Sequence, residues 1–254
     1  MLIDTHCHIH DADYPLDVTE TINRAHQADV QQLICVGTDQ NNSKLAVELA
    51  SRNDGLYAAV GVHPHEAKAG WHEINNLLNL QTPSIIAVGE IGLDYHYNHS
   101  PHDVQIQALK AQIELALKFD LPIIFHVREA FDDFWPVFDS YSSAGQRIRG
   151  VLHSFTDSAE NLAAGLKRDL YIGINGYSTF VRDESQKAMF NSIPLSKIIL
   201  ETDAPYLTPA PFRGKVNEPA FVRTVVEHLS NIRQIPYDEV AKTTSENARA
   251  LFKI

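Results

Sequence analysis

Two histidines stand one residue apart in the stretch THCHI, which begins at Thr5. The short apolar run that leads into them starts at Leu2 and is typical of a β-strand, in which alternate side chains point to opposite faces. His6 and His8 would then share one face, and Cys7 would point the other way as a small buried side chain. Two imidazoles on one face can bind a metal ion, but such pairs also occur by chance. The stretch alone leaves metal binding open.

Eight short apolar runs, rich in β-branched residues, recur with room for one helix between each pair. Near-continuous apolar strands favour a parallel sheet that is buried on both faces. The runs are LIDTH (2 to 6), QLICVG (32 to 37), LYAAVGV (56 to 62), SIIAVGE (84 to 90), LPIIFH (121 to 126), GVLHSF (150 to 155), LYIGING (170 to 176) and KIILETD (197 to 203). They predict a (β/α)₈ TIM barrel, a fold of about 250 residues, as a single domain over residues 1 to 254.

The intervals between these runs have the periodicity of helices. Apolar residues from Ile106 to Leu117 repeat every three or four positions and stop before Pro122. Beyond the eighth run, a similar pattern from Phe221 to Leu229 predicts another helix, and SENARALF (245 to 252) predicts a short one. The segment YHYNHSPHD (95 to 103) fits neither a strand nor a helix face. We expect it to be an exposed polar loop; the alternatives are transient substrate contact and an accessory metal site.

Composition excludes several classes of protein. A net charge of −11 argues against broad binding to duplex DNA, which needs many basic contacts to phosphate. The sequence has no apolar run of eighteen residues and only two cysteines, which predicts a cytoplasmic protein with neither a membrane span nor a disulfide framework. Nothing in the sequence marks an interface, so we expect a monomer.

The barrel makes a specific demand, because active sites in this fold lie at the carboxyl ends of the strands. Residues that can bind metal are concentrated there. Those that follow or end a predicted strand are His6, His8, His63, His65, Glu90, His126, His153 and Asp203, with Arg128 just beyond His126. Any one of these histidines could be a hydrogen-bonded residue at a strand end. Their recurrence at one rim favours a metal centre.

The ligand types narrow the choice of metal. Imidazole with carboxylate suits Zn²⁺, Mn²⁺, Fe²⁺ or Ni²⁺ better than Ca²⁺, whereas Mg²⁺ usually prefers more oxygen. Six candidates exceed what one tetrahedral ion needs, so we expect two divalent ions. The predicted arrangement places His6, His8 and Asp203 on one ion, His126 and His153 on the other, and Glu90 between them. Two such ions can hold a bridging hydroxide and stabilise a leaving oxygen, and Asp203 can accept a proton from the attacking water.

Whole phrases of the sequence resemble the TatD-type deoxyribonuclease family of metal-dependent hydrolases. The similar stretches are DTHCHI (4 to 9), VGVHPHEA (60 to 67), VGEIGLDY (88 to 95), LPIIFHVREA (121 to 130), LHSFTDS (152 to 158), ETDAPYLTP (201 to 209), RGKVNEP (213 to 219) and SENARALF (245 to 252). The resemblance implies a divalent-metal nuclease, with Zn²⁺, Mn²⁺ or Mg²⁺, whose ligands are the six residues above. It implies single-stranded or frayed DNA as substrate and degradation from the 3′ end. It also makes His63 a substrate-binding or acid-base residue near the phosphate.

Two positions depart from the family pattern. Leu109 stands where phenylalanine is usual, which indicates a change in core packing. Asp157 stands where glycine is usual, and it adds negative charge near the mouth of the barrel, where a polyanionic strand must be accommodated.

Several residues have both a functional and a structural interpretation. The guanidinium of Arg128 suits phosphate oxygens, but it could instead pair with an acidic residue of the following loop. Arg213 and Lys215 could bind substrate or lie in a solvated loop. We interpret His65 as a structural residue. We interpret Glu201, one layer below Asp203, as a residue that orients a metal ligand.

Two other functions compete with the nuclease. Related barrels hydrolyse small amides, esters or lactones with a similar metal rim, and many of them use a carboxylated lysine where this chain has Glu90. A binding protein with a structural metal is the third possibility, but a closed structural site would not need six ligands on an open rim.

Overall fold

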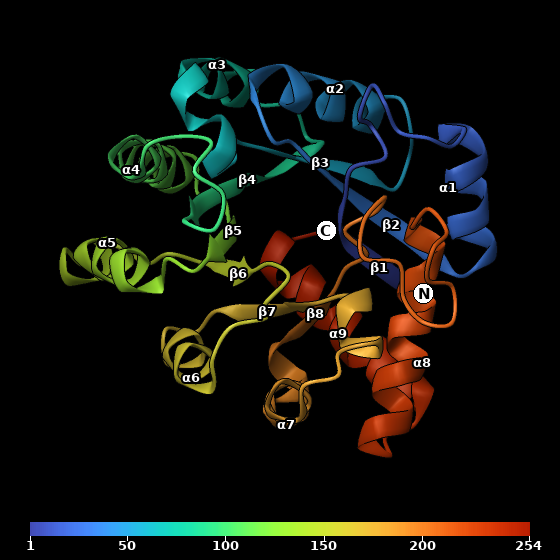
Figure 1. Cartoon of the computed structure of the whole chain (residues 1–254). Coiled ribbons are helices and arrows are strands. Elements are labelled where there is room, and N and C mark those ends of the chain that lie inside the picture. Colours follow the sequence, from blue (N-terminus) through green and yellow to red (C-terminus); the bar gives the residue numbers. More distant parts are fainter. The chain divides into compact units, whose positions relative to one another are not determined.

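The computed structural model describes all 254 residues. Its strands form one parallel eight-stranded sheet in the order β1 to β8, and helices alternate with the strands along the chain (Figure 1). The strands are β1 (Leu2–Cys7), β2 (Val30–Val36), β3 (Leu56–Val60), β4 (Ile85–Asp94), β5 (Ile123–Arg128), β6 (Gly150–Leu152), β7 (Tyr171–Ile174) and β8 (Ile198–Leu200). This architecture is the (β/α)₈ TIM barrel predicted from the sequence.

The helices also follow the predicted order. The α-helices are α1 (Val18–Gln27), α2 (Gln40–Ser51), α3 (His72–Asn79), α4 (His102–Lys118), α5 (Phe131–Ser143), α6 (Ala159–Lys167), α7 (Glu184–Ser192), α8 (Val222–Arg233) and α9 (Tyr237–Phe252). Short 3₁₀ turns are η1 (Pro64–Ala69), η2 (Gly176–Thr179), η3 (Leu195–Lys197) and η4 (Pro219–Phe221). The short helix expected at 245 to 252 is the second half of α9. No helix is long and apolar enough to cross a bilayer.

Contacts along the chain divide it into two compact parts. The first part contains residues 1–35 and 154–254, and the second part contains residues 36–153. The single domain expected over the whole chain remains a prediction.

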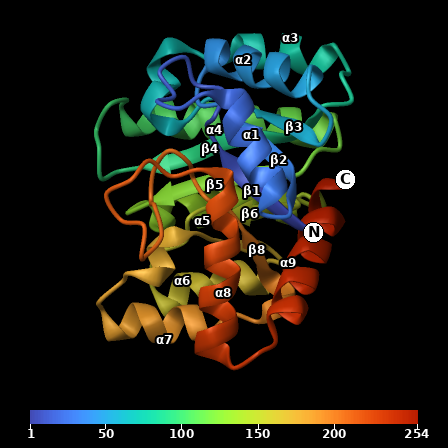
Figure 2. The ribbon, with the colours of Figure 1, turned by 90° about the vertical axis from the view of Figure 1, so that its right-hand side faces the viewer.

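The first part joins the two ends of the sequence. Ser245 Oγ in α9 donates to the carbonyl of Met1, and Asn247 Nδ2 donates to the carbonyls of Leu195 and Ile198. Figure 2 shows α8 and α9 side by side. The buried residues of α8, which run from Val222 to Leu229, repeat at the spacing that predicted this helix. Packing of the helices on β1 and β8 therefore holds the first and last strands together.

The second part is a continuous segment built around β4, whose ten residues are all buried. Phe125 of β5 packs against Phe134 and Phe138 of α5, with ring centroids 5.1 and 6.0 Å apart. Leu109 in α4 is fully buried, so this position belongs to the core. Gln105, also fully buried in α4, holds the end of β4 by accepting from the backbone N–H of Asp94 and donating to its carbonyl.

The strand ends differ from the prediction, and two of the differences concern candidate metal ligands. Glu90 was expected to end the fourth strand, but β4 continues to Asp94, and the register with β5 shifts between Val88 and Ile91. Asp203 was expected at the end of the eighth strand, but β8 ends at Leu200 and Asp203 has a left-handed backbone with φ of 59°. Aspartate tolerates this conformation better than most residues, so the chain can turn there without glycine.

Candidate metal centre

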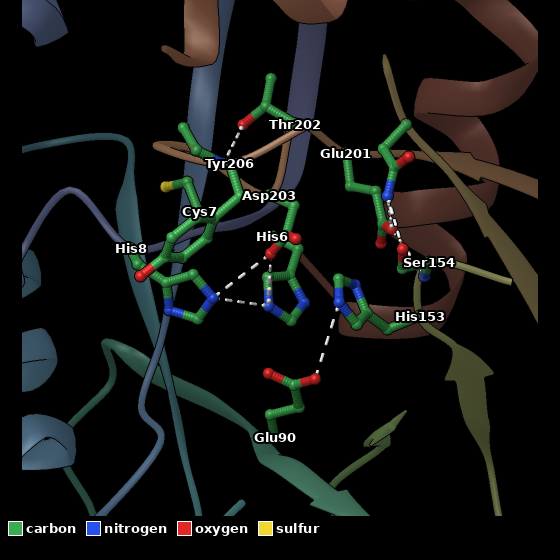
Figure 3. A network of polar contacts seen from close by, with 12 residues as sticks. His6, Cys7, His8, Glu90, His153, Ser154, Glu201, Thr202, Asp203 and Tyr206 are labelled. Carbon is green, nitrogen blue, oxygen red and sulfur yellow. Dashed lines mark hydrogen bonds and ion pairs between the residues drawn. The ribbon is translucent and has the colours of Figure 1, made fainter. Parts of the chain in front are cut away.

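The first cluster consists of His6, His8 and Asp203 and lies within the first part. Figure 3 shows the two imidazoles and the carboxylate converging. The two Nε2 atoms are 3.1 Å apart, and Asp203 Oδ1 lies 3.7 Å from that of His6 and 3.4 Å from that of His8. Ligands about 2.1 Å from a zinc-sized ion lie about 3 to 3.5 Å from one another. The spacing of the three atoms therefore fits one divalent ion.

Backbone hydrogen bonds fix this geometry. The N–H of Asp203 donates to the carbonyl of His6 at 2.8 Å, and the N–H of His8 donates to the carbonyl of Ala204 at 2.7 Å. The extended chain at the end of β1 is thus paired with the turn after β8. Cys7 is fully buried, as predicted from the alternation of the strand. The alternation and the two bonds bring His6 and His8 to one face opposite Asp203.

Asp4 lies two residues before His6 in β1 and was not singled out in the sequence. Its fully buried carboxylate accepts from the backbone N–H of Thr202 at 2.8 Å and from Thr202 Oγ1 at 2.6 Å. Burial raises the pKa of Asp4 to about 8, although the hydrogen bonds from Thr202 act in the opposite direction. Asp4 therefore ties β1 to the residue that precedes Asp203.

Glu201, two residues before Asp203, is a second buried carboxylate. Its Oε1 accepts from the backbone N–H of Ser154 at 2.7 Å and lies 3.3 Å from Nδ2 of Asn175 (Figure 3 shows the Ser154 contact). These bonds hold the Glu201 side chain in place, and its role in orienting a metal ligand remains a prediction. A further group, His10 and Asp11 beside His8, was missed, although its histidine continues the alternation of His6 and His8. His10 Nε2 lies 3.6 Å from Asp11 Oδ1.

The second cluster consists of Glu90, His126 and His153 and lies within the second part. Glu90 Oε1 is 2.8 Å from His126 Nδ1 and 3.6 Å from His153 Nε2; Figure 3 shows the His153 contact. Glu90 and His153 are buried. Carboxylate oxygen with imidazole nitrogen is a donor combination that suits a divalent ion. Within the second part, the ligand atoms that all lie within 4.8 Å of one another are those of His63, Glu90 and His126, so the structure does not bring His126 and His153 together as closely as predicted.

His126 contacts a carboxylate through each of its ring nitrogens. Its Nε2 lies 2.9 Å from Oδ2 of Asp94, while its Nδ1 faces Glu90. Burial lowers the pKa of His126, but its hydrogen bonds with Asp94 and Glu90 outweigh this effect, and the pKa is raised. Two carboxylates that retain a proton on this ring would also favour a divalent cation beside it. Metal-binding histidines almost always donate their other N–H to such a partner, so Nδ1 is the ligand atom that the geometry favours.

Asp94 was not predicted as a site residue, although it lies in the family-like stretch VGEIGLDY (88 to 95). Its side chain is buried, and it lies near His126 and 3.0 Å from His65 Nε2. It also accepts the backbone N–H groups of His96 and Tyr97. Burial acts to raise the pKa of Asp94, but its hydrogen bonds, led by the one with His126, outweigh this effect. The pKa of Asp94 is therefore lowered, and the carboxylate is ionised. Asp94 lies four residues beyond Glu90, and it joins the site because β4 continues past Glu90.

His63 lies beside the second cluster as an N–H donor. Its Nδ1 accepts the backbone N–H of His65 at 3.1 Å, and its Nε2 lies 3.9 Å from Glu90 Oε1. Burial, followed by the charge of His126, lowers the pKa of His63 well below its ordinary value. The ring is therefore neutral at pH 7. Because Nδ1 accepts a hydrogen bond, the proton of the neutral ring is on Nε2. This arrangement favours a hydrogen bond from Nε2 to a bound substrate over metal binding by Nε2.

The predicted basic residues each lie over an aromatic ring. The guanidinium of Arg128 is exposed and 5.0 Å from the ring centroid of Tyr97. The acidic neighbours suggested as its partners have others: Glu129 pairs with His96, and Asp133 accepts the hydroxyl of Tyr95.

On the first part, Arg213 lies 3.8 Å from the ring centroid of Phe180 and donates to the carbonyl of Thr208. Lys215 Nζ lies 5.5 Å from the centroid of Phe212. Asp157 accepts from the backbone of Ser158 and from Asn161 Nδ2. The extra charge that Asp157 adds is thus engaged at the start of α6.

Comparisons with known proteins identify the family of this chain. The family model described as TatD related DNase matches residues 3–253. The chain belongs to the TatD family. It is 37% identical to the metal-dependent hydrolase YabD of Bacillus subtilis over 258 residues, covering the full length of both chains. It is 35% identical to the 3′-5′ ssDNA/RNA exonuclease TatD of Edwardsiella piscicida over 267 residues, again over the full length of both.

The fold agrees with a solved structure of the same family. The crystal structure of YjjV, a TatD homologue from Escherichia coli K12, superposes with a TM-score of 0.92 at 30% identity. The match covers all of this chain and 98% of that one. Membership of the TatD family makes the protein a metal-dependent hydrolase.

Proposed function

We propose that this TatD-family protein is a divalent-metal-dependent nuclease that removes nucleotides from the 3′ end of single-stranded or frayed DNA. The observation that carries the proposal is the second cluster with His63 beside it. The neutral imidazole of His63 has its N–H at Nε2, 3.9 Å from the carboxylate of Glu90. It can donate to a phosphate oxygen there without binding the metal. The name of the relative from Edwardsiella piscicida supports the substrate class, and it leaves RNA as a second polymer to test.

Two divalent ions are proposed as cofactors. His6, His8 and Asp203 would hold one. His126 and His153, which each contact Glu90, would hold the other with it. The bridging role of Glu90 remains a prediction. Divalent ions at such sites make water a stronger nucleophile and neutralise charge on phosphate oxygens. Zn²⁺ and Mn²⁺ suit the imidazole-rich donors best, and Mg²⁺ is the third candidate.

The side chains supply the remaining steps of phosphodiester hydrolysis. Asp203 accepts the proton of the water as its oxygen bonds to phosphorus, since the carboxylate is part exposed beside the first cluster. The bond from phosphorus to the sugar oxygen breaks, and that oxygen takes up the proton. His63 donates its Nε2 proton as a hydrogen bond to a phosphate oxygen and so offsets the charge that develops there. Arg128 and Arg213 contribute positive charge for the strand, which a chain of net charge −11 must supply locally.

A substrate panel tests the proposal directly. The protein, loaded in turn with Zn²⁺, Mn²⁺ or Mg²⁺, is incubated with single-stranded DNA, duplex DNA and RNA labelled at either end, and with a chromogenic phosphodiester, a lactone and an amide. We expect stepwise shortening of 5′-labelled single-stranded DNA and loss of activity in Glu90→Gln. Glu48→Gln, which alters an exposed acid of α2, is the matched control.

The outcomes separate the nuclease from its competitors. A metal-loaded protein that cleaves no phosphodiester but hydrolyses a lactone or amide would replace the nuclease with a small-molecule hydrolase. Degradation from the 5′ end would overturn the direction of cleavage alone. Metal content without hydrolysis of any substrate would favour a binding protein.

A further inference from the structure

The segment between β4 and α4 presents rings to solvent. Four consecutive residues, 96 to 99, are exposed, and Tyr97 retains 46% of its surface. This segment was expected to be an exposed polar loop, with transient substrate contact as an alternative. An exposed tyrosine ring is a large apolar surface left in water, so its arrangement with its neighbours indicates what could cover it.

Tyr97 and His99 present adjoining faces. Their ring centroids are 5.8 Å apart, and their planes are inclined by only 26°. His65 contacts both rings edge-on, with centroids 5.6 Å from Tyr97 and 4.7 Å from His99. The guanidinium of Arg128 lies over the ring of Tyr97. We refer to Tyr97 and His99, supported by His65 and Arg128, as the ring platform.

Hydrogen bonds to buried residues hold the ring platform in one conformation. Asp94 accepts the backbone N–H of Tyr97 at 3.0 Å. At the other end of the segment, buried Ser100 donates its hydroxyl to the carbonyl of His65 at 2.7 Å, and Gln105 Nε2 donates to the carbonyl of Ser100 at 2.9 Å. A platform that is already ordered loses little entropy when a ligand stacks on it.

The ring platform is joined to the second cluster. Asp94, which holds the backbone of Tyr97, also contacts His126. The ring centroids of His65 and His126 are 6.3 Å apart. Each nucleotide of a stacked strand advances by about 3.4 Å, so the platform lies within a few nucleotides of the metal ligands.

We infer that the ring platform stacks a base of a single-stranded nucleic acid whose phosphate is bound at the second cluster. The inference rests on the proposed nuclease function and deepens it. Aromatic rings bind every base through its π face, with about 1 to 3 kcal/mol per stacked base, so this subsite tolerates any sequence. A guanidinium can stack on a ring and still direct its N–H groups to a phosphate, which gives Arg128 both roles. Duplex DNA keeps its bases paired and stacked, so the platform selects unpaired strands.

Binding measurements with three variants test the inference. A fluorescent single-stranded DNA whose linkages are phosphorothioates, to slow cleavage, is titrated with metal-loaded protein. Tyr97→Leu retains an apolar side chain without a π face, and we expect it to weaken binding about 5-fold to 150-fold, as 1 to 3 kcal/mol implies. Tyr97→Phe retains the ring and should bind normally. Tyr141→Leu removes an aromatic ring from α5, far along the chain from the platform, and should also bind normally.

Abasic substrates identify the stacked base. A stable abasic residue is placed in turn at each of the last five nucleotides. At the position that stacks on Tyr97, the abasic residue should weaken binding to the normal protein and have no further effect on Tyr97→Leu, because both changes remove one contact. Thermal unfolding of each variant checks that the fold is retained.

Each outcome bears on the inference. Equal affinity of the normal protein and Tyr97→Leu, or additive losses at every abasic position, would overturn the platform while leaving the nuclease function intact. If the normal protein neither binds nor cleaves nucleic acid, the proposed function and the platform both fail. Weaker binding of Tyr97→Phe as well as Tyr97→Leu would show that the hydroxyl, and not the stacked ring, makes the contact.

Discussion

Asp94 Oδ2 lies 2.9 Å from Nε2 of His126, on the side of the ring opposite Glu90. This contact orients the imidazole and fixes which nitrogen is available to a metal ion. The predicted ligand and the carboxylate that orients it belong to neighbouring strands, which pair at Asp94 and Arg128. Asp94, which is not itself a predicted metal ligand, can thus affect how tightly His126 would bind a metal ion.

We expect Asp94→Asn to weaken metal binding at the second cluster about 10-fold to 100-fold, the usual effect of losing such an outer partner. The amide keeps the size of the side chain but removes the charge that favours a cation near His126. Isothermal titration with Zn²⁺ measures the change. Asp133→Asn, which alters an acid bonded to Tyr95 on the same part, is the control. Unchanged metal affinity would show that Asp94 serves only the backbone of its loop.

The two clusters should be separable by counting ions. His8→Asn and His126→Asn each remove one imidazole from a different cluster, and each variant should retain about one ion where the normal protein binds two. Elemental analysis of dialysed protein gives the stoichiometry. Loss of both ions from either variant would mean that the ions bind cooperatively, and one ion in the normal protein would contradict the two-ion proposal.

Asp203→Asn should lower kcat about 100-fold to 10,000-fold, the range for a lost general base. The amide cannot accept a proton and is a weaker metal ligand. Measuring the rate at saturating metal separates these effects, because a pure ligand defect is then relieved. An unchanged kcat would remove Asp203 from proton transfer.

Gly173→Ala should destabilise the protein by about 1 to 3 kcal/mol. A Cβ at Gly173 would lie 2.5 Å from Oε2 of Glu201, whose buried side chain is held by Ser154 and has little room to move. Urea unfolding gives the free energy. In the background of Glu201→Ala the clash is gone, so the same glycine change should cost little there. Equal costs in both backgrounds would exclude Glu201 as the cause.

His228 in α8 should contribute to loss of stability in acid. Burial lowers its pKa below 6.5, with a hydrogen bond to the backbone of Ser178 acting in the opposite direction. The unfolded chain therefore binds a proton first as the pH falls. The stability that depends on uncharged His228 is fully present above about pH 6.5, and it is lost as the pH falls through the pKa of His228 in the folded protein. Comparing the urea unfolding of His228→Gln with that of the normal protein from pH 7.5 to 4.5 should show their difference shrinking in acid. Parallel curves would contradict this assignment.

Patterns of apolar residues were sufficient to predict the strand order and most helices, because buried strands and amphipathic helices must repeat at fixed spacings. The exact strand ends were not accessible in this way. Glu90 lies inside β4, at the point where the register with β5 shifts. Asp203 lies three residues past β8 and has a left-handed backbone conformation. Such local backbone conformations depend on hydrogen bonds to distant segments, as between Asp203 and His6.

The candidate metal ligands could be selected from the sequence because metal chemistry restricts them to histidines and carboxylates that follow the predicted strands. Their supports were harder to find. Asp4 and Asp94 occur within quoted motifs, yet an aspartate in a strand gives no indication of which partner it will meet. Their roles depend on Thr202 and His126, which lie 198 and 32 positions away along the chain.

The two clusters also differ in how far apart their members lie along the chain. The second cluster comes from one continuous segment, but the first joins His6 and His8 to Asp203, near the other end of the sequence. A polypeptide still attached to the ribosome exposes residues 63 to 153 long before Asp203 emerges. Until then His6 and His8 have no third ligand from that end, so the growing chain cannot complete its first metal site. If both ions are needed for cleavage, the protein stays inactive beside its own messenger until its synthesis is almost finished.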